Sequence, residues 1–252
     1  MAALTWELYS DALEMGTSVR VVLPQDTDSQ VGVEAREAGP ELPVLYLLHG
    51  LSDDHTAWTR YTSIERYAEQ AGIAVVMPSA GRSFYADELH GQRWWTWVSQ
   101  ELPDLVQRYL RVSARREDTW VAGLSMGGYG ALKLALTHPE RYAGAASLSG
   151  ALDAVALARG PSRVPLFERV FGGEPGPADD LFALLESADP SALPPLHVSC
   201  GVDDVLLPQS QRFVAAAEAR GLTVTTQYPP GGHEWAVWDA VVADVVDWLP
   251  RS

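Results

Sequence analysis

Short apolar runs alternate with helix-forming segments along most of this chain, and this alternation limits the fold more than any other feature. The strand-like runs lie at 44–50, 74–78, 119–125, 143–150, 196–201 and 222–229. Segments with helical periodicity lie at 63–72, 97–111, 126–139, 209–220 and 234–249. A strand, a crossover helix and a further strand, repeated in this way, form a mostly parallel central sheet that helices cover on both faces. The sequence therefore predicts an α/β fold.

Two segments depart from this rhythm. Near the start, β-leaning runs at 5–10 and 18–23 predict an antiparallel edge of the sheet, and a polar loop is expected over 25–41. Between two sheet strands, 153–195 is rich in Pro, Gly and Ala and has only short helical pieces. It reads either as a small helical insertion over the carboxyl ends of the strands, where it could act as a lid, or as an ordinary helical crossover.

Length and composition favour a single domain over 1–252. A chain of 252 residues with 47% hydrophobic content can build one sizeable core. No apolar run approaches the roughly 18 residues that span a bilayer, so no membrane association is expected. The N-terminal residues are partly acidic and lack the basic start and apolar stretch of a secretory signal. A cytoplasmic location is therefore expected.

Charge and cysteine content exclude several classes of function. A formal net charge of −15 would repel a phosphate backbone, so nucleic acid is not expected as a partner. The lone Cys200 rules out an internal disulfide and a multi-cysteine zinc site. Because no H-E-x-x-H or paired-ligand motif appears either, neither a metal nor a cofactor is expected. The sequence is compatible with a homo-oligomer.

The run GLSMG at 123–127 matches the G-x-S-x-G pattern of a nucleophilic serine on a tight strand-to-helix turn. An apolar strand-like run precedes Ser125, and a helix-forming run follows it, as that turn requires. Side chains two positions away on either side would collide with the turn, which explains the two glycines. Ser149 and Ser79 also lie at strand ends, but neither has the flanking pair of glycines. Ser125 is therefore the candidate nucleophile.

The candidate acid and base follow the serine in the order expected for an α/β-hydrolase, with the histidine after the last strand. His233 lies in the run GGHEW, directly after the predicted strand at 222–229. A carboxylate must hold its imidazole so that the ring can accept the serine proton. Asp203 and Asp204 both follow the preceding strand, and their spacing alone does not decide between them.

Acyl transfer also needs two backbone N–H groups that point at the developing oxyanion. Met126, directly after the nucleophile, is expected to supply one of them. Leu51 is expected to supply the other, because a glycine before it lets the backbone approach a substrate. Candidate residues for the walls of the substrate pocket are His49, Gly50, Trp58 and Trp235.

Five ordered segments, HGLSDDHTAW, GLSMGGYGALKLAL, SLSGAL, CGVDD and GGHEWAVWD, resemble the esterase D superfamily of α/β-hydrolases. Members of this superfamily include tributyrin-type acetyl esterases, S-formylglutathione hydrolases, feruloyl esterases and mycolyltransferases. The resemblance covers nearly the whole chain. It implies that Ser125 is the nucleophile and His233 the base, and it places the acid on the second aspartate of CGVDD, which is Asp204.

Within the superfamily the chain is most similar to the tributyrin-type esterases. The resemblance implies a serine carboxylesterase that hydrolyses short-chain acyl esters through an acyl-enzyme, with a small-molecule ester as its substrate. S-formylglutathione hydrolases typically have Leu-Thr-Cys after the oxyanion glycine and a histidine before the nucleophile. This chain has Leu51-Ser52-Asp53 and Leu124 at those places. The alternatives are an S-formylglutathione hydrolase or an acyltransferase of the same superfamily and, more remotely, a non-catalytic binding module.

Overall fold

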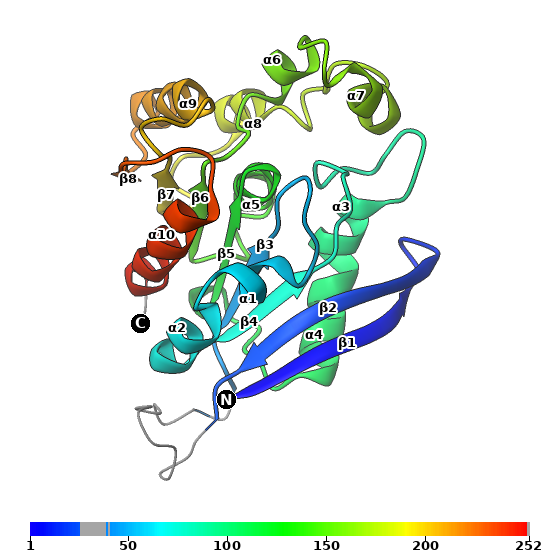
Figure 1. Cartoon of the computed structure of the whole chain (residues 1–252), viewed down its shortest axis with the longest axis vertical. Coiled ribbons are helices and arrows are strands. Elements are labelled where there is room, and N and C mark those ends of the chain that lie inside the picture. The colour runs from blue at the N-terminus through cyan, green and yellow to red at the C-terminus, as the bar shows by residue number, and fades with distance from the viewer. Residues whose placement is uncertain (26–38, 40, 251–252) are drawn as a thin grey trace.

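Strands from the first to the last part of the described chain form one eight-stranded sheet (Figure 1). The computed structural model describes residues 1–25, 39 and 41–250, so most of the predicted 25–41 loop lies outside the described residues. The strands are β1 (Ala2–Ser10), β2 (Met15–Leu23), β3 (Val44–Leu48), β4 (Ala74–Pro78), β5 (Thr119–Leu124), β6 (Gly144–Leu148), β7 (Leu196–Ser199) and β8 (Val224–Gln227).

The strand order is β1-β2-β4-β3-β5-β6-β7-β8. β1 pairs with β2, and β2 with β4, in the antiparallel sense. Every other neighbouring pair is parallel. The predicted mostly parallel sheet with an antiparallel edge is therefore confirmed.

Helices cover both faces of this sheet (Figure 1). They are α1 (Ala57–Tyr61), α2 (Ile64–Ala71), α3 (Trp94–Thr96), the π-helical turn η1 (Trp97–Glu101), α4 (Leu102–Tyr109), the 3-10 turn η2 (Arg116–Asp118), α5 (Met126–Thr137), α6 (Ala154–Ala158), α7 (Val164–Phe171), α8 (Leu181–Ser187), α9 (Leu207–Ala219) and α10 (Trp235–Trp248). No helix in the described part of the chain is both long enough and apolar enough to cross a bilayer.

The two faces of the sheet bury two separate apolar cores, and β3 shows how one strand serves both. Leu45 and Leu47 belong to the core that α2 and α10 cover. Val44, Tyr46 and Leu48 point the other way, into the core that contains α4, α5 and α9. Because successive side chains of a strand alternate between faces, a strand buried on both sides must be apolar at every position. This explains why the central strands are continuous apolar runs in the sequence.

The helix predicted over 97–111 differs from expectation, because its first five residues form the π-helical turn η1 and the α-helix α4 begins only at Leu102. Pro103 has no N–H and cannot donate to the carbonyl of Ser99 four residues earlier. The guanidinium of Arg141 donates to that carbonyl instead. At the end of the turn, the carboxylate of Glu101 accepts hydrogen bonds from the Ser10 hydroxyl at 2.5 Å and the Ala12 N–H at 3.0 Å. The irregular turn thus anchors the β1–β2 connection to the main body.

Helices α6, α7 and α8 form the predicted insertion, and a buried ion pair fastens it to α5. Lys133, the only lysine of the chain, is 3% exposed and donates to Asp179 Oδ1 at 2.5 Å, just before α8. Its ammonium also lies 4.2 Å from the centre of the Trp95 ring. The Tyr129 hydroxyl donates to the Asp179 carbonyl at 2.6 Å. Burial lowers the pKa of Lys133, and Asp179 opposes that change.

We expect Asp179→Ala to lower the free energy of unfolding by about 3 kcal/mol, because it leaves a buried ammonium without its partner. This is the low end of the usual range, since Asp179 itself is 26% exposed. Adding Lys133→Met should recover part of the loss, because no buried charge then remains. Glu174→Ala is the control, since its pair with Arg159 at 2.8 Å is exposed and should contribute little. Urea unfolding of the wild type and the three variants measures the differences, and an equal loss for Asp179→Ala and Glu174→Ala would contradict the expectation.

Candidate active site

A tight turn joins β5 to α5 and has Ser125 at its tip. Ser125 has φ 53° and ψ −116°, a conformation that residues other than glycine rarely adopt. Its N–H donates to the Leu148 carbonyl at 2.9 Å, and its own carbonyl accepts from the Ala151 N–H at 3.0 Å. Hydrogen bonds from β6 and the loop after it therefore hold the strained residue in place.

The two glycines of the turn lie where a side chain would collide with backbone. A Cβ atom on Gly123 would lie 2.4 Å from the Gly127 carbonyl oxygen. A Cβ atom on Gly127 would lie 2.4 Å from the Leu48 carbonyl oxygen in β3. The helix can begin this close to the sheet only without side chains at these positions, which is the steric requirement that the sequence motif predicts.

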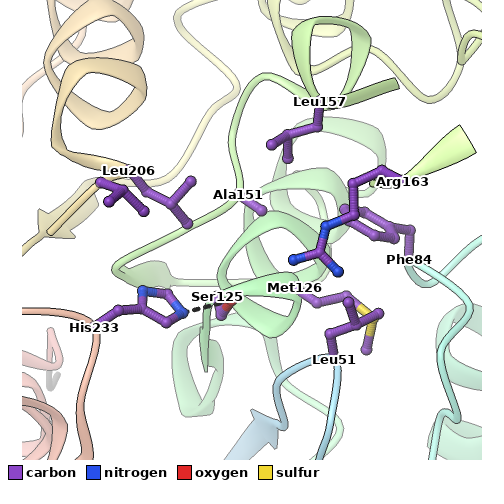
Figure 2. A pocket seen from close by; sticks show the side chains of 10 residues that line it. Leu51, Phe84, Ser125, Met126, Ala151, Leu157, Arg163, Leu206 and His233 are labelled. Atoms are coloured by element: carbon purple, nitrogen blue, oxygen red, sulfur yellow. Dashed lines mark hydrogen bonds between the residues drawn. The ribbon is translucent and has the colours of Figure 1, made fainter. Parts of the chain in front are cut away.

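Three side chains from distant parts of the sequence form one hydrogen-bonded line. His233 Nε2 lies 3.0 Å from Ser125 Oγ (Figure 2). His233 Nδ1 lies 2.8 Å from Asp204 Oδ2. An imidazole held by a carboxylate on one nitrogen can accept a serine proton on the other. The structure thus brings together the three residues that the sequence selected.

Asp204 is buried, and Asp203 is exposed. Burial alone would raise the pKa of Asp204, but hydrogen bonds from His233 and from the Leu206 N–H, at 2.8 Å, hold that pKa below its usual range. A charged carboxylate therefore faces the imidazole. Asp203 takes part through its backbone instead, because its N–H donates to the Gly231 carbonyl at 3.0 Å.

Backbone contact between two loops positions the imidazole. The loop after β7 carries Asp204, and the loop after β8 carries His233. The Val202 N–H donates to the Pro229 carbonyl at 2.9 Å. A Cβ atom on Gly201 would lie 2.3 Å from the Gly231 carbonyl oxygen, so glycine is needed where the two loops touch. The His233 ring then packs edge-on against Trp238 at 4.9 Å.

A buried histidine shapes the loop that follows β3. His49 Nδ1 lies 2.7 Å from the Gly50 carbonyl, and its Nε2 accepts from the Ala80 N–H at 2.9 Å. Burial lowers the pKa of His49 to about 4, so the ring is neutral near pH 7. The Tyr85 hydroxyl donates to the His49 carbonyl at 2.9 Å. These bonds fix the backbone just before Leu51, which lines both cavities beside Ser125.

Two cavities open beside Ser125. The smaller, of about 170 Å³, is mostly apolar, and Leu51, Phe84, Met126, Ala151, Leu157, Val205 and Leu206 supply its apolar lining (Figure 2). The larger, of about 860 Å³, is a groove with a mixed lining that includes Gly50, Asp53, Arg82, Glu234 and Trp235; because it is more polar than the smaller cavity, we call it the polar groove. Ser125 and His233 line both of them. A substrate at Ser125 can therefore place an apolar part and a polar part in different surroundings.

The four predicted pocket residues divide into two that line the groove and two that do not. Gly50 and Trp235 line the polar groove. The predictions for Trp58 and His49 are wrong. Trp58 is 0% exposed, and its indole donates to the Leu48 carbonyl at 3.1 Å. Its ring packs edge-on against the ring of Trp235, and the two ring centres lie 5.4 Å apart. His49 is 1% exposed and holds the loop as described above.

Sequence reasoning missed several lining residues because their order in the chain gives no sign of it. Phe84 comes from the loop after β4, where it has a left-handed φ of 50°. Leu157 and Arg163 come from the insertion. The one available signal was their location in segments after the carboxyl ends of parallel strands, where ligands bind in such sheets. Within residues 1–25, 39 and 41–250, no group of His, Cys, Asp or Glu side chains is arranged to hold a metal ion.

Comparison with known proteins shows that the whole chain is similar to esterases and serine hydrolases. A family model described as putative esterase matches residues 10–249. An acetyl esterase of Caldicellulosiruptor saccharolyticus is 28% identical over 100% of this chain and 99% of its own length. The substrate-bound structure of a fluorophosphonate-binding serine hydrolase of Staphylococcus aureus is 30% identical, with a TM-score of 0.86 over 100% of this chain and 99% of its own. An S-formylglutathione hydrolase of Staphylococcus aureus is 29% identical, with a TM-score of 0.81 over 99% of both chains.

We expect Gly127→Ala to damage both stability and activity, because the new methyl group would press on the Leu48 carbonyl. Overpacking of this kind costs about 1–3 kcal/mol of unfolding free energy. Displacing Ser125 by about 1 Å should also lower kcat/KM on an ester substrate by roughly 100-fold. Gly176→Ala is the control, because a Cβ atom there would meet nothing within 4 Å. Normal turnover by Gly127→Ala would show that the close contact with β3 is dispensable.

Proposed function

Since the chain belongs to the esterase family whose model spans 10–249 and is a serine carboxylesterase of the α/β-hydrolase fold, we propose that Ser125, His233 and Asp204 are its catalytic triad. The observation that carries this proposal is the hydrogen-bonded line from Ser125 through His233 to a buried Asp204. A single-domain organisation and a cytoplasmic location stay predictions from the sequence, and the sequence stays compatible with a homo-oligomer.

The proposed reaction has two steps. Ser125 Oγ attacks the ester carbonyl carbon while His233 Nε2 accepts its proton. The carbonyl oxygen becomes negative and accepts hydrogen bonds from the backbone N–H groups of Leu51 and Met126. Met126 is the first residue of α5, so its N–H has no acceptor within the helix. The alcohol leaves with the proton from His233, and a water molecule activated by the same imidazole then releases the acid.

The two cavities suit different parts of the ester, one for the acyl chain and the other for the alcohol. We assign the apolar cavity to the acyl chain, because its lining offers few partners for polar groups. The open polar groove takes the alcohol part, which must leave after the first step. This assignment supports esters of short-chain acids as substrates, consistent with the acetyl esterase relative.

A thioester is the second candidate substrate, because an S-formylglutathione hydrolase is 29% identical over almost the whole chain. Against it, Ser52, Asp53 and Leu124 stand where those enzymes typically have other residues. Comparing kcat/KM on S-formylglutathione with that on p-nitrophenyl acetate decides between the two. The oxygen ester should be the better substrate. Acyl transfer to an added alcohol, measured as ester product, tests for a transferase.

Ser125→Ala should reduce kcat on p-nitrophenyl acetate by roughly 10⁴-fold or more, because the acyl-enzyme can no longer form. The same variant should lose covalent labelling by a fluorophosphonate probe. Ser79→Ala is the matched control, since Ser79 also ends a sheet strand but bonds to His55 at 2.9 Å and lines neither cavity. Near-normal turnover or labelling by Ser125→Ala would remove Ser125 from the mechanism, and with it the proposed triad.

The size of the apolar cavity predicts a limit on acyl length. A protein cavity of about 150 Å³ holds a benzene molecule, so a cavity of about 170 Å³ should accept an acyl chain of about six carbons. We expect kcat/KM on p-nitrophenyl esters to be highest at or below hexanoate and to fall at octanoate. Leu157→Ala should move the optimum toward longer chains, because it enlarges the cavity. Leu184→Ala in α8, outside the cavity lining, should leave the optimum in place, and an identical shift in both variants would contradict the assignment.

A further inference from the structure

One charged side chain of the insertion lies at the junction of the two cavities. Four residues line both the apolar cavity and the polar groove, namely Leu51, Ser125, Arg163 and His233. Three of them already have roles in the proposed reaction, and Arg163 has none. Figure 2 shows its guanidinium pointing from the insertion into the space beside Phe84 and Met126. A permanently charged guanidinium therefore lies beside Ser125, where the ester is to be cleaved.

Arg163 and its neighbour in the groove, Arg82, are not used by the fold. Within the described part of the chain, neither guanidinium forms a hydrogen bond or ion pair. Two other arginines of the same region are paired, because Arg159 bonds to Glu174 at 2.8 Å and Arg169 bonds to Glu88 at 2.6 Å. The insertion thus leaves positive charge available where the substrate binds.

The acidic side chains of the groove are bound to the protein backbone. Glu234 Oε1 accepts the Gly232 N–H at 3.1 Å. Burial raises the pKa of Asp53, while a hydrogen bond from the Gly50 N–H opposes that rise. Each carboxyl group thus has a backbone N–H partner in its own loop, in contrast to the two arginines. An anionic ligand therefore finds partners in the groove, whereas a cationic ligand would compete with the backbone.

Building on the proposed ester hydrolysis, we propose that the enzyme prefers esters whose alcohol part carries a carboxylate, and that Arg163 and Arg82 bind this carboxylate in the polar groove. A guanidinium matches a carboxylate with two parallel N–H donors. The alcohol part is favoured over the acyl part because Arg82 lines the groove and does not line the apolar cavity. A carboxylate in the apolar cavity would also lose hydration among mostly apolar side chains, with Arg163 as the one arginine of that lining.

The net charge of the whole protein cannot account for a preference for anionic esters. With a formal net charge of −15, the protein as a whole repels anionic substrates. A preference for an anionic ester must then arise from groups next to the reacting bond. Removing the Arg163 guanidinium should therefore abolish the preference for the anionic ester.

The test compares 4-acetoxybenzoate with its neutral counterpart 4-acetoxybenzamide. The acyl group and the ring are the same, and each kcat/KM is divided by the rate of hydroxide-catalysed hydrolysis to correct for the leaving group. The ratio of the two values is the readout, so a general loss of activity in a variant cancels. For the wild-type enzyme we expect a ratio of about tenfold or more in favour of the anion, the scale of a charge-assisted hydrogen bond.

Four variants assign this ratio to the proposed residues. Arg163→Gln should reduce it to about one or below, and Arg163→Lys should keep part of it because the charge remains. Arg82→Gln should lower it by a smaller factor. Arg159→Gln is the matched control, since it removes an arginine of the same insertion that lines neither cavity, and its ratio should equal that of the wild type. A wild-type ratio of one or less, or an unchanged ratio in Arg163→Gln, would overturn the proposal.

A second pair of esters tests which part carries the charge. The monoglutarate and the pentanoate of p-nitrophenol have the same number of acyl carbons, and only the first has an acyl carboxylate. If the anion were preferred in this pair and not in the acetoxy pair, the assignment to the groove would be wrong. Failure of the parent function looks different, because 4-acetoxybenzamide would then not be hydrolysed, or its hydrolysis would persist in Ser125→Ala.

Discussion

The contact between the β5–α5 turn and β3 is the constraint on which the active site depends. Gly127 lies so close to the backbone of β3 that a methyl group on it would overlap the Leu48 carbonyl, and a methyl group on Gly123 would overlap the Gly127 carbonyl within the turn. This approach holds Ser125 in its strained conformation, with its hydroxyl above the sheet and its helix beginning directly behind it. The N–H of Met126 then points out of the first turn of α5 without an acceptor in the helix. One steric contact thus positions the hydroxyl and one of the proposed oxyanion donors together.

The order of the strands explains why the histidine needs a long loop. β8 lies three strands away from β5, which at a spacing of about 4.8 Å is a separation of roughly 14 Å. The chain after β8 therefore has to return across the ends of β7 and β6 before His233 can reach Ser125. Hydrogen bonds from Val202 and Asp203 to the returning segment support it on the way. The loop that carries the acid is thus also the support for the loop that carries the base.

The features that depend on local patterns could be predicted from the sequence. The strands and their mostly parallel arrangement follow from apolar runs that are buried on both faces, and Ser125 follows from a steric motif in its required context. Asp204 needed the family resemblance, because its choice over Asp203 depends on which way two adjacent side chains point. Trp58 shows that a residue near the site in sequence need not line the site in the fold. It lies close to the oxyanion loop, yet its ring turns into the core and bonds to β3.

Residues of the insertion could not be assigned to the site in advance, because their positions depend on contacts with distant segments. Two ion pairs, each with one buried partner, hold the insertion. One joins the buried Lys133 to Asp179, and the other joins the buried Glu88, in the loop after β4, to Arg169 in α7. The backbone of α7 also accepts hydrogen bonds from the N–H groups of Leu89 and His90.

These contacts bear on whether the insertion could move as a lid. Opening it would separate the Lys133 and Glu88 side chains, which are 3% and 0% exposed, from their charged partners. These ion pairs oppose a lid-like opening of the insertion, which lines both cavities through Arg163. Selectivity for the substrate then depends on the side chains that the insertion presents, with Leu157 facing the apolar cavity and Arg163 at the junction.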